Sequence, residues 1–82
     1  MEIQDFAQMV LFHRKKSGMS REDCARLAGV GKTALYDMEH GKASVQMDTV
    51  LKVLHVLNIK IQFTSPLMHL LESEPPMAND TQ

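Results

Sequence analysis

The 82-residue sequence predicts an all-α fold, with four to five short helices in one small domain, followed by one short strand. Two observations indicate the helices. Apolar residues recur at helical spacing in two segments, and a capping serine and several glycines mark helix boundaries. The strand is indicated by a strict alternation of apolar and polar residues over 59–64.

The first helix is expected over residues 3–16. One of its faces carries apolar and half-polar residues at helical spacing, namely Ile3, Phe6, Ala7, Val10 and His13. Gly18 is placed to end this helix. Leu11 and Phe12 fall outside that face. They are either ordinary exposed apolar side chains or a patch that binds a partner.

Residues 18–41 predict two short helices joined by a tight glycine turn. Ser20 is a favourable N-cap for the first of them, and Gly29 is expected to stop it. The next helix is expected from residue 32 to 40, where Gly41 ends it. Two helices joined in this way form a helix-turn-helix, the element that lays its second helix in the major groove of DNA.

A fourth helix is expected over residues 47–57, and its apolar side chains surround most of the helix. A helix that is apolar nearly all round needs burial on two sides, whereas four small helices enclose only one core. The second side is therefore expected to meet another subunit. Val53 and Val56 are the residues of this helix that we assign to that interface.

The strand pattern over 59–64 has no second strand pattern in the chain to pair with. Asn58, which tolerates the left-handed conformation, is expected to end the helix before it. Because a lone strand leaves its backbone groups unpaired, we expect antiparallel pairing with the same strand of a second subunit across a two-fold axis. Ile59, Ile61 and Phe63 would then join the dimer interface. An extended segment without a partner is the alternative.

The chain is therefore expected to have three parts. Residues 1–58 form the helix-turn-helix domain. Residues 59–71 form the dimerisation strand and a short apolar segment, separated by Pro66, which cannot continue a strand ladder. Residues 72–82 form a disordered acidic tail.

Residues 10–59 resemble the lambda-repressor-like domains of the Cro/Xre type, a helix-turn-helix family. The resemblance lies in a series of short matches: Arg14 four residues before Gly18, then Gly-Met-Ser at 18–20, Ala25, Gly29-Val30, Leu35 and Met38-Glu39-x-Gly41. The sequence departs from the family where Gln is common (Arg21), where Leu is common (Cys24) and where Ser or Thr caps the third helix (Gly31). The resemblance implies a lambda-repressor-like fold, to which the alternation over 59–64 adds one short C-terminal strand.

The strand after the fourth helix is similar to that of the HipB-type antitoxins. In that group the strand pairs between the subunits of a dimer. Its members repress their own operon and bind a HipA-like kinase toxin. The resemblance therefore implies an autorepressor and antitoxin that binds a palindromic operator as a homodimer. A stand-alone Xre-type repressor without a toxin, or a module whose main task is protein binding, is the alternative.

The third helix would be the recognition helix. Leu35 and Met38 are expected to point into the core. The residues expected to contact DNA bases are polar and share the outward face: Lys32, Thr33, Tyr36 and Asp37. For Asp37 a local ion pair is the alternative, because phosphates repel a carboxylate.

Phosphate contacts are expected from residues at the helix ends and loops that flank the groove in this fold: Arg14, Arg21, Gly31 and Lys42. For Arg14 the alternative is an internal salt bridge with Glu39. The formal net charge is −1, but residues 13–42 carry seven basic side chains against four acidic ones. Basic charge is thus concentrated around the helix-turn-helix.

Other function classes find little support in the sequence. It contains neither a phosphate-binding loop nor a plausible nucleophile triad, so no enzymatic activity and no cofactor are expected. The four histidines have no paired spacing, so no metal site is expected either. Cys24 is expected to be inert packing. One cysteine, an acidic N-terminus and the lack of a long apolar run favour a cytoplasmic protein without a membrane partner.

Overall fold

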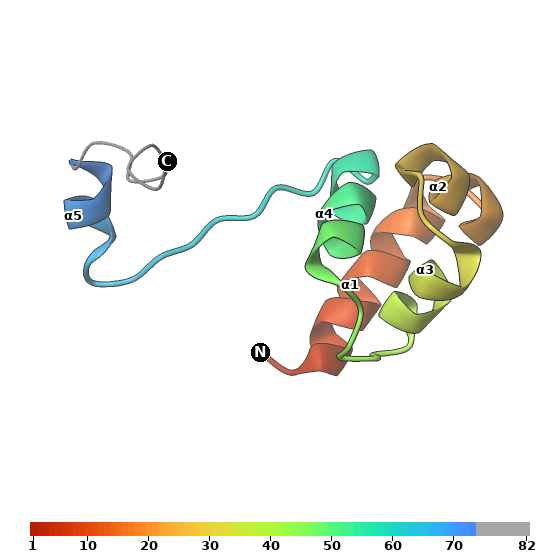
Figure 1. Cartoon of the computed structure of the whole chain (residues 1–82), viewed down its shortest axis with the longest axis horizontal. Coiled ribbons are helices and arrows are strands. Elements are labelled where there is room, and N and C mark those ends of the chain that lie inside the picture. The colour runs from red at the N-terminus through yellow and green to blue at the C-terminus, as the bar shows by residue number, and fades with distance from the viewer. Residues whose placement is uncertain (74–82) are drawn as a thin grey trace, which may run out of the picture.

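The structure is a computed structural model that describes residues 1–73. Four helices form a small domain, from which an extended segment leads away to a fifth helix (Figure 1). The elements are α1 (Ile3–Lys16), α2 (Arg21–Ala28), α3 (Lys32–Glu39), α4 (Met47–Val56) and α5 (Met68–Glu72). The expected all-α fold with four to five helices is confirmed.

The helix boundaries follow from their capping residues. The Ser20 hydroxyl accepts a hydrogen bond from the backbone N–H of Asp23 at 3.0 Å, as expected of the N-cap of α2. Gly29 ends α2 with φ 73°. Asn58, after the end of α4, has φ 59°, and Ile59 N–H donates to the Leu54 carbonyl at 2.9 Å. The left-handed residue therefore closes α4 as the sequence predicts.

The core lies between α1, α2, α3 and α4. α2 contacts both α3 and α4, and α1 contacts α3. The core residues are buried and mostly aliphatic: Val10, Cys24, Ala25, Leu35, Met38, Val53, Leu54 and Leu57. Leu35 and Met38 thus point inward, as expected. On α1 the buried face runs through Ala7 and Val10, whereas Ile3 is 44% exposed.

One residue of the expected dimer interface is placed wrongly by the sequence. Val53 is fully buried in the core of its own domain and has no surface for a second subunit. The reason is that α4 is apolar on most of its sides, so its periodicity does not distinguish the inner side from the outer one. Leu51 and Met47 of the same helix are 48% and 67% exposed. Val56 is half-buried.

The extended segment over 59–64 forms no strand within the described residues 1–73, so the predicted strand is not shown there. Within residues 1–73, the backbone groups of residues 60–64 make no hydrogen bond. The short apolar segment after Pro66 forms α5. Of the acidic tail expected over 72–82, Glu72 ends α5, and the part from residue 74 onward lies outside the described residues. No helix among the described residues is long and apolar enough to cross a membrane.

Cys24 is expected to resist thiol reagents in the folded protein. It is fully buried, and this burial raises the pKa of its thiol, so the reactive thiolate is disfavoured. Mass spectrometry after brief alkylation should show an unlabelled chain, and the same treatment in urea should label it completely. Because the folded pKa is raised, the thiol's contribution to stability is present below the free-thiol pKa of about 8.5 and declines above it. Rapid native labelling would contradict this packing.

Candidate nucleic-acid interface

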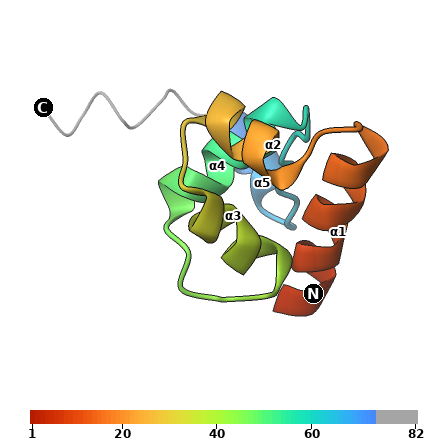
Figure 2. The ribbon, with the colours of Figure 1, turned by 90° about the vertical axis from the view of Figure 1, so that its right-hand side faces the viewer.

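The turn between α2 and α3 sets the geometry of the site. Val30 N–H donates to the Ala25 carbonyl at 3.0 Å, which folds the chain back on α2. Gly31 then caps α3 without a side chain, so the first backbone N–H groups of α3 stay open to a ligand. Figure 2 shows α2 and α3 facing the viewer with α5 behind them. The helix-turn-helix and α5 therefore lie on opposite sides of the domain.

The outward side chains of α2 and α3 meet at a shallow hollow. Arg21, Lys32, Thr33 and Tyr36 line it. Three of the four expected base contacts and one expected phosphate contact therefore lie together. Lys32 comes within 4.0 Å of Glu22, but both side chains are largely exposed. Such a surface pair contributes about 0–1 kcal/mol, so the ammonium group is free to find another partner.

Tyr36 is held between two other side chains. Its ring stacks on His40 with a centroid distance of 3.8 Å and an interplanar angle of 17°. On Arg21 the guanidinium carbon lies 5.1 Å from the same ring centroid, within range of a cation–π interaction. No role for His40 was predicted from the sequence. Its i+4 spacing from Tyr36 was the available signal.

Asp37 is paired within the domain. Its carboxylate lies 3.5 Å from the Lys42 ammonium group, and the Lys42 backbone N–H donates to the Asp37 carbonyl at 3.0 Å. Of the two interpretations from the sequence, this geometry favours the local ion pair over a base contact. Lys42 remains more than half exposed, so it can still turn toward a phosphate.

Arg14 is an internal residue, and its assignment to DNA phosphates is wrong. It is only 7% exposed. Its Nη2 donates to Glu39 Oε1 at 3.1 Å, and its Nη1 donates to the Met19 carbonyl at 3.0 Å. The hydrogen bonds that Arg14 donates to the Glu39 carboxylate raise the pKa of Arg14. The guanidinium group is thus used within the domain, which is the alternative that the sequence left open.

Glu39 also binds Arg21, a contact that sequence reasoning missed. Arg21 Nε donates to Glu39 Oε1 at 3.0 Å, and the Glu39 side chain is fully buried. One carboxylate therefore holds two guanidinium groups. The Arg21 side chain is 28% exposed, so one edge is anchored while the rest reaches the hollow. A separation of 18 residues has no periodicity that would reveal this contact.

A family model described as helix-turn-helix matches residues 13–63, more than half of the chain. The chain belongs to the Cro/Xre-type helix-turn-helix family. This helix-turn-helix chain is also 34% identical over 62 residues to the uncharacterized HTH-type transcriptional regulator y4mF of Sinorhizobium fredii. The aligned part covers 76% of this chain and 82% of that relative. Together these similarities support a DNA-binding transcriptional regulator.

Membership of this family identifies the second helix of the motif. In a helix-turn-helix domain the second helix of the motif enters the major groove, and its N-terminal residues contact base edges. That helix is α3, and its first two residues are Lys32 and Thr33. The family match also extends through residue 63, so it includes most of the extended segment after α4.

Proposed function

We propose that this chain is a sequence-specific repressor that binds a two-fold symmetric operator as a homodimer and occludes a promoter. The observation that carries the proposal is the exposed hollow at the start of α3, lined by Arg21, Lys32, Thr33 and Tyr36. This arrangement combines donors for base edges with a cation for the phosphate backbone. Two such hollows, about one turn of DNA apart, would read the two half-sites.

Each residue of the hollow has a chemistry that suits DNA. The Lys32 ammonium group can donate to guanine O6 or N7, and the Thr33 hydroxyl can bond a base or its methyl can touch thymine. Tyr36 can contact a base edge or a phosphate. Phosphates would be held by the exposed part of Arg21, by the open backbone N–H groups after Gly31, and by Lys42.

The homodimer is supported by the unpaired segment after α4. Ile61 is 45% exposed and Phe63 is 75% exposed. These exposed fractions are high for the apolar side chains of an alternating segment. Antiparallel pairing with a second copy would give the backbone of residues 60–64 its hydrogen bonds. It would also bring the apolar side chains of Ile59, Ile61 and Phe63 from the two copies together.

The proposal is tested by removing the first two side chains of α3. Operators are first selected from random duplexes, and the affinity of the Lys32→Ala, Thr33→Ala variant is then measured by fluorescence anisotropy. A good base contact contributes about 1–3 kcal/mol, and a dimer carries each change twice. We expect operator affinity to fall at least about a hundredfold, toward that for random duplex.

A matched control removes the same charge elsewhere. Lys60 lies in the extended segment, outside the hollow. The Lys60→Ala variant should weaken operator and random duplex equally and only slightly, because an unspecific cation acts on phosphates alone. Equal operator affinity for the Lys32→Ala, Thr33→Ala variant and the intact protein, at matched salt, would refute base reading by α3.

A second candidate function is that of an antitoxin that holds a HipA-like kinase. It rests on the strand-like segment after α4 and on an exposed apolar residue of α1 that does not line the hollow. Phe12 is 56% exposed, and the Lys16 ammonium group lies 5.7 Å from its ring centroid. A kinase encoded beside this gene should co-purify with the intact protein and with the Lys32→Ala, Thr33→Ala variant. Loss of kinase binding in that variant would show that the kinase and the DNA use the same surface.

A further inference from the structure

α5 carries apolar side chains that its own domain does not cover. Leu67, Leu70 and Leu71 are 66%, 51% and 58% exposed, and they recur at the i, i+3, i+4 spacing of one helix face. Figure 1 shows α5 well apart from the four-helix domain. A helix of five residues is not stable in water by itself. α5 therefore needs a surface to pack on.

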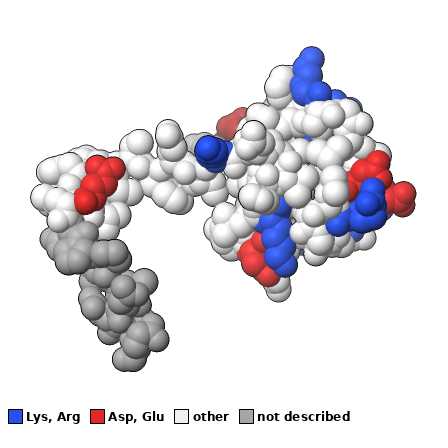
Figure 3. Space-filling model, turned by 90° about the horizontal axis from the view of Figure 1, so that it is seen from above, with Lys and Arg blue, Asp and Glu red and all other residues white. Residues whose placement is uncertain are grey.

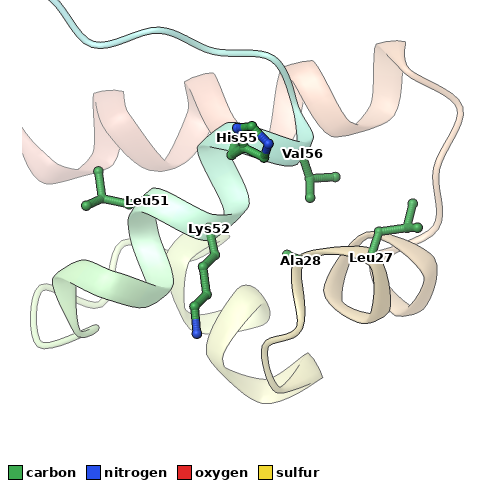
Figure 4. A pocket seen from close by; sticks show the side chains of 6 residues that line it. All are labelled: Leu27, Ala28, Leu51, Lys52, His55 and Val56. Carbon is green, nitrogen blue, oxygen red and sulfur yellow. The ribbon is translucent and has the colours of Figure 1, made fainter.

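The domain offers an apolar groove at the ends of α2 and α4. It is lined by Leu27, Ala28, Leu51, Lys52, His55 and Val56 (Figure 4). Leu27 is 60% exposed and Leu51 is 48% exposed, so neither side chain serves the core. Figure 3, viewed from above, shows that most of this face of the domain is uncharged, with Lys, Arg, Asp and Glu gathered at a few places.

We propose that α5 of each protomer docks in this groove on the second copy of the chain. The proposal rests on the homodimer proposed above. If residues 59–64 pair antiparallel about a two-fold axis at Ile61, Phe63 lies opposite Ile59 of the partner subunit and Thr64 lies opposite Asn58 of the partner subunit. Residues 65–66 then reach the end of α4 of the partner subunit, where His55 and Val56 line the groove. The strand register thus delivers α5 to the groove entrance.

The two surfaces match in chemistry as well as position. The leucines of α5 meet the leucines of the groove, and burial of both sets removes apolar area from water. Glu72 ends α5, and Lys52 lines the groove, so the pair brings opposite charges together. A return of α5 to its own groove would require the segment after α4 to reverse direction, whereas it leads away from the domain (Figure 1).

Subunit mixing tests the exchange directly. One chain carries Leu27→Cys, the other carries Leu70→Cys, and the mixed dimer is oxidised mildly. The native Cys24 is fully buried and does not compete. We expect a covalent dimer on a denaturing gel. A Gln8→Cys chain, changed on exposed α1, should give none with the same partner. The absence of any cross-link in the mixed dimer would overturn the exchange of α5 between subunits. So would a 27–70 cross-link that forms only within one chain carrying both cysteines.

Dimer affinity provides a second measurement. In sedimentation equilibrium, the Leu70→Ala, Leu71→Ala variant should have a dimer dissociation constant raised at least about tenfold. His69→Ala, a change on the other side of the same helix, should leave the constant unchanged. A leucine variant with the intact protein's constant refutes the docking of α5 and leaves the homodimer in place. An intact protein that is monomeric on its operator refutes the homodimer itself.

Discussion

Replacing Glu39 with glutamine is expected to destabilise the domain by about 3 kcal/mol or more. The Glu39 carboxylate is fully buried and accepts hydrogen bonds from Arg14 and Arg21. Glutamine removes the negative charge and turns an amide N–H₂ toward guanidinium donors, leaving the buried cation of Arg14 without compensation. Since small domains have a free energy of unfolding of about 5–15 kcal/mol, urea denaturation should show a large shift of the midpoint.

The matched control for this change is Glu22→Gln. Glu22 lies on the exposed surface of α2, and its carboxylate is 4.0 Å from the Lys32 ammonium group. The same chemical substitution should cost less than about 1 kcal/mol there, because solvent screens an exposed pair. If both variants unfold at the same urea concentration, the cluster of Glu39 and two arginines does not hold α1, α2 and α3 together as the structure indicates.

Local signals predicted the fold where they have a direct backbone meaning. Ser20, Gly29 and Asn58 each mark a helix boundary, and the structure has a boundary at each. Such residues act within one turn of the chain, so no tertiary information is needed. Val53 shows the limit of such local signals. Its helix is apolar on most sides, and only the packing of α2 and α4 determines which side becomes the core.

The residues of the candidate site also fall into those that local spacing predicts and those that only tertiary packing brings together. Lys32, Thr33 and Tyr36 share a helix face, so their spacing alone brings them together. The contacts of Arg14 and Arg21 with Glu39 join residues 25 and 18 positions apart, and only the packed helices create them. A charged residue beside a helix-turn-helix therefore has two possible uses, contact with phosphate or support of the motif. Burial distinguishes them, and burial is a tertiary property.

Ile61→Pro is expected to convert the proposed dimer to a monomer. Proline has no backbone N–H and cannot sit within a paired strand. A lost buried hydrogen bond costs about 1–3 kcal/mol, and a two-fold dimer carries the change twice. The dimer dissociation constant should therefore rise at least about thirtyfold. Sedimentation equilibrium measures this rise, and operator affinity should fall toward that of a single half-site.

Ile61→Val provides the control for this change, because valine keeps the N–H and the branched side chain. That variant should sediment as the intact protein does. The proline variant should retain its helical circular dichroism, since residue 61 lies beyond α4 and its backbone makes no hydrogen bond within the described chain. A folded proline variant with an unchanged dimer mass would show that the alternation over 59–64 does not serve strand pairing. The two copies would then have to meet elsewhere, for example through the exposed Leu51 side of α4.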